Sequence, residues 1–206
     1  MNTFKFLTLV ALFIGFTSCN DDDSPNILEI ESKTVSNLQA TQTANYSTNP
    51  PTITGDFIKF SFKIGTTITS NDWDIAFRGS TIIINGGEGT AEDQPERTGN
   101  AGAYIATGTL ASITNVDDSL FVFDSTESGL AITTGSGNGW YNYDSTTHII
   151  SPIPGKVIVV KTIDGNYAKL EILSYYENSE PNAELSNSQY YTFNYVYQPN
   201  EGVTTF

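Results

Sequence analysis

The sequence of 206 residues is poor in the side chains that form disulfides and metal centres, with one Cys, one His and one Met. A single Cys excludes an internal disulfide, and one Cys with one His excludes a structural zinc site, which takes four such ligands. Basic residues are also scarce, at 9 Lys and Arg against 23 Asp and Glu, and the net charge is −14. Nucleic acid is therefore not an expected partner, because phosphate contacts require clustered Lys and Arg.

Helical periodicity is missing from the sequence, whereas aromatic residues (12 %), Gly (17) and Pro (8) are plentiful. Period-2 alternation and β-branched runs predict strands over residues 57–64, 73–77, 81–84, 120–123, 130–133, 156–163, 167–176 and 190–197. The sequence therefore predicts one all-β domain of antiparallel strands at residues 52–198, with at least eight strands and a C-terminal tail at 199–206. The aromatic stripe of residues 191–197 is interpreted as core.

The N-terminus has the features of a signal peptide at residues 1–18, in which Lys5 precedes an apolar run too short to cross a bilayer. The small residues before Cys19 resemble the lipobox of bacterial lipoproteins, whose Cys is acylated. A plain secretory signal is the alternative. The acidic run 21–23 resembles an export tag for the outer face of the outer membrane, or is a solvated spacer. Residues 19–51 are predicted to be the lipidated N-terminus and a flexible polar tether.

Two further features bear on function. Residues 86–102 form a Gly-rich polar loop that is too long for an ordinary connection, and we interpret it as a candidate lid. The many carboxylates could supply a glycosidase pair, but no nucleophile elbow or ordered Ser, His and Asp set supports catalysis. We therefore expect a binding protein and not an enzyme.

Five segments, in their order along the chain, resemble the HmuY family. They are Trp73-Asp74-Ile75-Ala76, the glycine-rich residues 85–89, Gly139-Trp140-Tyr141-Asn142-Tyr143, residues 156–169 with Asp164-Gly165-Asn166, and residues 192–197. Members of that family are all-β lipoproteins anchored in the outer membrane of Bacteroidetes-type bacteria. The resemblance implies that the chain captures haem, free or from a haem-carrying protein, and passes it to a TonB-dependent receptor.

The axial ligands of that family are missing here. A pair of His or Met side chains clamps the iron from the segments on either side of the Gly-Trp element. In this chain residues 120–139 hold neither residue type, and Ser145 stands where the second His would fall. His148 lies three residues further on.

The candidate haem site is therefore composed of Trp140, Tyr141, Tyr143 and His148, with His148 as the metal ligand. Three arrangements remain open: His148 with a phenolate of Tyr141 or Tyr143, His148 alone, or two chains that share one haem. The aromatic side chains would suit a porphyrin face. Alternatively, His148 only packs at the start of a strand, and the chain is a β-rich interaction lipoprotein that does not bind haem.

Overall fold

The computed structural model describes residues 27–182 and 185–206, and the signal peptide and Cys19 lie outside them. Thirteen strands and three 3-10 helices form within the described residues. The five-stranded sheet has the order β1 (Glu31–Gln39), β13 (Ser188–Gln198), β12 (Tyr167–Tyr176), β11 (Lys156–Lys161) and β8 (Gly102–Thr107). The four-stranded sheet has the order β5 (Thr66–Ile68), β4 (Ile58–Ser61), β6 (Ile75–Arg78) and β7 (Thr81–Ile84).

Two separate hairpins complete the strands, β2 (Thr43–Asn45) with β3 (Thr52–Thr54), and β9 (Tyr141–Asp144) with β10 (Ile149–Pro152). All pairings between these strands are antiparallel, which confirms the predicted all-β class. The short helices are η1 (Asp118–Leu120), η2 (Glu177–Ser179) and η3 (Leu185–Asn187). Within the described residues, no helix has the length and apolar character needed to span a bilayer.

Aromatic side chains join the two sheets. The ring centroids of Phe62 and Tyr195 are 5.4 Å apart, and those of Phe77 and Tyr191 are 4.8 Å apart. Phe193 lies between these pairs and stacks on Phe77 at 5.6 Å. These side chains are fully or almost fully buried, so the prediction that the stripe at 191–197 is core is confirmed.

The four-stranded sheet is buried on both faces at β6 and β7, whereas β5 is largely exposed. The outer face of the sheet carries a second cluster of Phe57, Trp73, Ala76 and Ile83. A strand covered on both sides needs apolar residues at successive positions, which explains why the residues of β6 are all buried.

Asp74, which precedes β6, connects the sheets through its carboxylate. One oxygen accepts the backbone N–H of Phe62 at 2.8 Å, and the other accepts the N–H of Ile163, after β11, at 3.0 Å. Burial raises the pKa of Asp74 to about 6, although both hydrogen bonds oppose this shift.

The raised pKa of Asp74 predicts a pH-dependent stability. Between pH ~4 and pH ~6 the folded chain binds a proton here that the unfolded chain releases, so the free energy of unfolding falls as the pH rises through this window. The loss is roughly 3 kcal/mol for a shift of this size. Urea unfolding of the wild type and of Asp74→Asn at pH 4 and pH 7 measures it. Equal pH dependence in the two proteins would contradict the assignment.

Several predicted strands are confirmed, and others are wrong. Residues 81–84 and 167–176 coincide with β7 and β12, and β11 and β13 lie where runs of β-branched and aromatic residues predict them. Residue 120 instead ends η1, residues 121–123 make a single bridge between Val122 and Ala103, and residues 130–133 form no strand. The sequence did not predict β8, because Gly and Ala have low strand propensity.

The predicted tether at residues 19–51 is corrected over β1. This strand pairs with β13 from Glu31 to Gln39, and Leu38 is buried beside Tyr191. Most other β1 side chains are exposed because the strand lies at the edge of the sheet, so its sequence shows almost no apolar alternation. The predicted tail is also packed: the N–H of Phe206 donates to the carbonyl of Thr114 at 3.0 Å.

The pairing of β1 with β13 leads to a prediction about truncation of the chain. A chain that starts at residue 52 leaves the edge of β13 unpaired and loses the buried Leu38. Its free energy of unfolding should fall by more than ~2 kcal/mol relative to a chain that starts at residue 27. Urea denaturation followed by circular dichroism compares the two, and equal midpoints would show that β1 is dispensable.

Candidate functional site

The base of the β9–β10 hairpin is fixed to the core by Trp140 and Tyr141. The indole N–H of Trp140 donates to the carbonyl of Ser80 at 3.0 Å, and its ring lies 5.3 Å from that of Tyr191. Trp140 is 2 % exposed and Tyr141 is 8 % exposed. Neither ring lines an open surface. The predicted porphyrin wall of Trp140 and Tyr141 therefore does not match their buried positions in this structure.

The tip of the same hairpin brings Tyr143 and His148 together. The Tyr143 hydroxyl lies 2.7 Å from Nδ1 of His148, and both residues are exposed. The turn between them is held by the Asp144 carboxylate, which accepts the backbone N–H of Thr146 at 2.8 Å. His148 closes the turn with a φ of 58°, a left-handed conformation in which His is enriched among non-glycine residues. The sequence-predicted Tyr and His are therefore adjacent.

The state of the imidazole determines what this pair can bind. Two tautomers satisfy the contact: either Nδ1–H donates to the Tyr143 oxygen, or the Tyr143 hydroxyl donates to Nδ1. Nε2 of His148 makes no hydrogen bond to any residue in 27–182 or 185–206. In the first tautomer Nε2 carries a free lone pair directed at solvent, which is the form that binds a metal.

The contact between the two side chains limits how they could share one iron in the conformation seen here. Nitrogen and oxygen ligands lie about 2 Å from a transition metal, so ligands on opposite sides of an iron are about 4 Å apart. The Tyr143 oxygen is 2.7 Å from Nδ1 of His148. Tyr141 is held in the core, where its hydroxyl is 3.4 Å from Ser80 Oγ. In this conformation the Tyr143 oxygen and Nδ1 of His148 are too close to lie on opposite sides of one iron, whereas Nε2 makes no hydrogen bond within the described residues.

No cluster of three or more His, Cys, Asp or Glu side chains suited to a metal ion occurs in the described part of the chain. The hairpin tip is accordingly a place where one imidazole could bind a metal whose other ligands come from elsewhere, as in a porphyrin.

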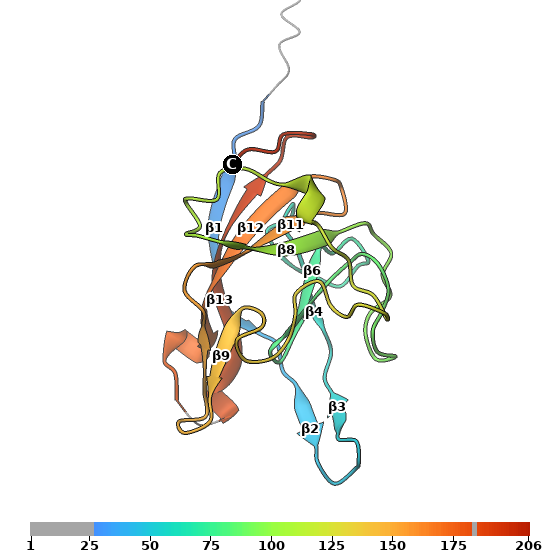
Figure 1. The fold of residues 1–206 in the computed structure, drawn as a ribbon, viewed down its shortest axis with the longest axis vertical. Coiled ribbons are helices and arrows are strands. Elements are labelled where there is room, and N and C mark those ends of the chain that lie inside the picture. The colour runs from blue at the N-terminus through green and yellow to red at the C-terminus, as the bar shows by residue number, and fades with distance from the viewer. Residues whose placement is uncertain (1–26, 183–184) are drawn as a thin grey trace, which may run out of the picture.

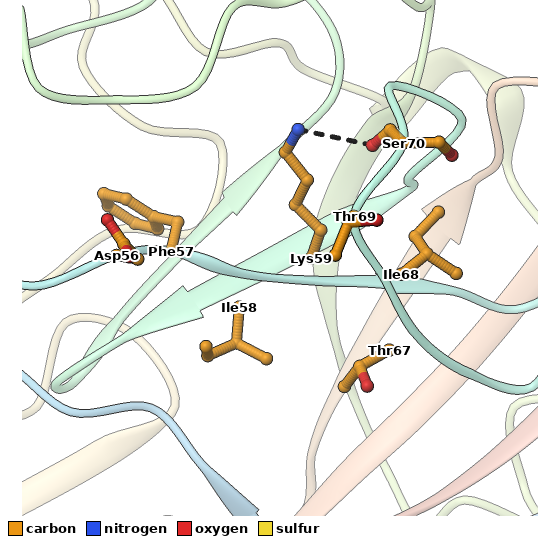
Figure 2. Close-up of a pocket in the computed structure, with 8 residues that line it drawn as sticks. All are labelled: Asp56, Phe57, Ile58, Lys59, Thr67, Ile68, Thr69 and Ser70. Atoms are coloured by element: carbon orange, nitrogen blue, oxygen red, sulfur yellow. Dashed lines mark hydrogen bonds between the residues drawn. The ribbon is translucent and has the colours of Figure 1, made fainter.

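A groove of about 690 Å³ lies apart from this hairpin, beside β4 and β5 (Figure 2). Its lining is Asp56, Phe57, Ile58, Lys59, Thr67, Ile68, Thr69 and Ser70. The Lys59 ammonium closes one side by donating to the carbonyl of Ser70 at 3.3 Å. The lining of the groove contains no His, Met or Tyr that could bind an iron. The groove and the predicted metal ligand on the hairpin tip are therefore in different places. Nothing in the sequence pattern distinguished these residues from an ordinary strand pair.

The Gly-rich loop at residues 86–102, expected as a lid, is held to the body by buried contacts. The Arg97 guanidinium donates to the Asp124 carboxylate at 2.9 Å, and these side chains are 2 % and 0 % exposed. The Asn85 side-chain oxygen accepts the backbone N–H groups of Thr98 and Gly99 at 2.8 Å and 3.0 Å. Burial raises the pKa of Asp124, while its hydrogen bonds and Arg97 oppose the rise. The loop is thus a fixed part of the fold.

The Arg97–Asp124 pair makes a prediction about stability. Asp124→Ala leaves a buried guanidinium without its partner and should lower the free energy of unfolding by about 3–5 kcal/mol. The matched control is Asp164→Ala, which breaks the exposed pair with Lys63 and should cost less than about 1 kcal/mol. Urea unfolding measures both, and similar losses would contradict the structural role of the buried pair.

Comparisons with known proteins place this geometry in context. A family model described as HmuY protein matches residues 53–195. No curated protein matches the chain. The chain is similar to the apo HmuY analog of Tannerella forsythia, with 18 % identity over 85 % of this chain and 100 % of that one and a TM-score of 0.43.

Two other solved structures are similar at the same level. A candidate lipoprotein from Bacteroides fragilis has 15 % identity over 84 % of this chain and 96 % of its own, with a TM-score of 0.43. A candidate HmuY-like haem-binding protein from Bacteroides vulgatus has 16 % identity over 83 % of this chain and 93 % of its own, with a TM-score of 0.41.

Proposed function

The chain belongs to the HmuY family, and we propose that it is a surface lipoprotein that captures haem. In this proposal Cys19 is acylated and anchors the protein in the outer membrane, with the domain on the exterior face. Haem, free or taken from a haem-carrying protein, is then passed to a TonB-dependent outer-membrane receptor. The protein acts as a binding protein and not as an enzyme.

The contact between Tyr143 and His148 carries this proposal. A metal-bound His usually donates its second ring N–H to a neighbouring oxygen, which fixes the tautomer and orients the ring. The Tyr143 oxygen, 2.7 Å from Nδ1, is placed to accept that hydrogen bond. Haem iron would then bind Nε2 of His148 as its single protein ligand, as a proximal His does in other haem proteins.

The remaining predicted residues receive different roles. Trp140 and Tyr141 support the hairpin from the core and do not touch the ligand. Tyr143 is 43 % exposed, and its ring is free to contact one edge of a porphyrin. Trp140 is a positioning residue in this account, because its hydrogen bond to Ser80 fixes the start of the hairpin.

Titration with ferric haem tests the proposal. The mature chain should shift the Soret band away from that of free haem, and His148→Ala should abolish the shift because it removes the only imidazole. Tyr143→Phe keeps Nε2 but removes the acceptor at Nδ1, so affinity should fall about 10–100-fold. Tyr46→Phe, on the exposed turn between β2 and β3, is the matched control and should leave the titration unchanged.

The same haem titration tests the second candidate function, that of a β-rich interaction lipoprotein that does not bind haem. The exposure of the Tyr143–His148 tip, together with a groove that lies beside other strands, favours this alternative. A wild-type spectrum equal to that of free haem, or a full shift that persists in His148→Ala, would rule out haem ligation by this hairpin.

A further inference from the structure

An apolar rim lies at the end of the molecule where the described chain begins. Ile27, Leu28, Ile30 and Val203 form it, with exposures of 78 %, 50 %, 41 % and 37 %. Leu28 is fixed there by Asn200, whose side-chain oxygen accepts the Leu28 N–H at 2.8 Å while its amide donates to the Leu28 carbonyl at 2.8 Å. The Val203 N–H donates to the Asn200 carbonyl, so both parts of the rim belong to one fixed unit.

Charges near this rim do not provide attraction to an anionic surface. Lys33 pairs with Glu31, and Lys63 pairs with Asp164 at 3.0 Å. Glu29 and Glu201 make no ion pair with any residue in the described ranges and leave this end negative. Grouped exposed apolar side chains are a feature of interaction surfaces, and a partner at this end would contact them without a basic patch.

The short length of chain between Cys19 and the rim points to the membrane as the partner of the rim. Nine peptide units separate Cys19 from Leu28, so the fold begins at most roughly 30 Å from the acylated Cys of the proposed function. Figure 1 shows the start of β1 and the C-terminus at one end of the molecule and the β2–β3 hairpin at the opposite end, with the β9–β10 hairpin on the same side as β2–β3. In the proposed function, the tether from Cys19 therefore joins the domain at the same end as the rim.

We propose that the apolar rim inserts into the lipid headgroup region and docks the domain on the membrane. This inference rests on the lipid anchor of the proposed function but is independent of haem. Apolar side chains at an interface add to the binding that acyl chains provide. Docking through this end directs the hairpin with Tyr143 and His148 away from the bilayer, where a ligand can reach it.

Fluorescence quenching in vesicles tests the docking. The full chain is produced in a host that acylates lipoproteins, and the lipidated protein is placed in phosphatidylcholine vesicles whose acyl chains are brominated near the headgroup. Val203→Trp adds an indole in the rim, and Tyr46→Trp adds one at the opposite end as the matched control. The native Trp73 and Trp140 are buried and give the same background in both proteins.

Brominated lipid should quench the added emission of Val203→Trp and leave that of Tyr46→Trp unchanged. Equal quenching of the two, or none in Val203→Trp, would overturn the docking. Glu201→Trp, in the same turn, should behave like Val203→Trp and provides a second probe if the first variant fails to fold.

Failure of the proposed function is detected separately. Mass spectrometry reports whether Cys19 carries lipid, and a haem titration of the same variants reports haem binding. If Cys19 is not acylated, the unlipidated chain is added to the same vesicles. Quenching of Val203→Trp then supports the rim as a membrane surface, and its absence overturns the inference.

Discussion

The aromatic contacts between the two sheets determine where every other feature of this protein lies. Phe62, directly after β4, and Phe77 of β6 meet Tyr195 and Tyr191 of the other sheet with ring centroids about 5 Å apart, a geometry that adds about 0.5–1.5 kcal/mol per pair beyond area burial. Trp140 extends the same packed surface by contacting Tyr191. Because that contact fixes the base of the β9–β10 hairpin, the aromatic core also determines the position of the exposed hairpin tip.

Within the nine residues from Trp140 to His148, buried side chains support the hairpin and exposed side chains form its tip. Trp140 and Tyr141 are buried and hold the hairpin, whereas Tyr143 projects to the surface and meets His148. The hairpin tip thus presents one imidazole beside a phenol oxygen. In the proposed function, His148 would hold the haem iron and Tyr143 would orient its imidazole.

Residues whose pattern reflects burial could be predicted from the sequence. The alternation of Ala168, Leu170 and Ile172 in β12 and the aromatic stripe of β13 identified the side chains that pack in the main core. β1 and β8 could not be predicted, since edge strands depend on backbone pairing to a neighbour distant in sequence. The adjacency of Tyr143 and His148 also depends on the turn conformation, which residue types at that spacing do not specify. The Arg97–Asp124 ion pair could not be predicted from neighbouring residues in the sequence, because its two side chains lie on separate loops.

The spin state of the ferric haem complex tests the central claim most directly. Electron paramagnetic resonance of the mature protein loaded with one equivalent of haem should give a high-spin ferric signal, as expected for iron with one imidazole from the protein. That signal should differ from the signal of haem mixed with His148→Ala. A low-spin signal, which requires two strong ligands, or an identical signal in His148→Ala, would contradict ligation by His148 alone.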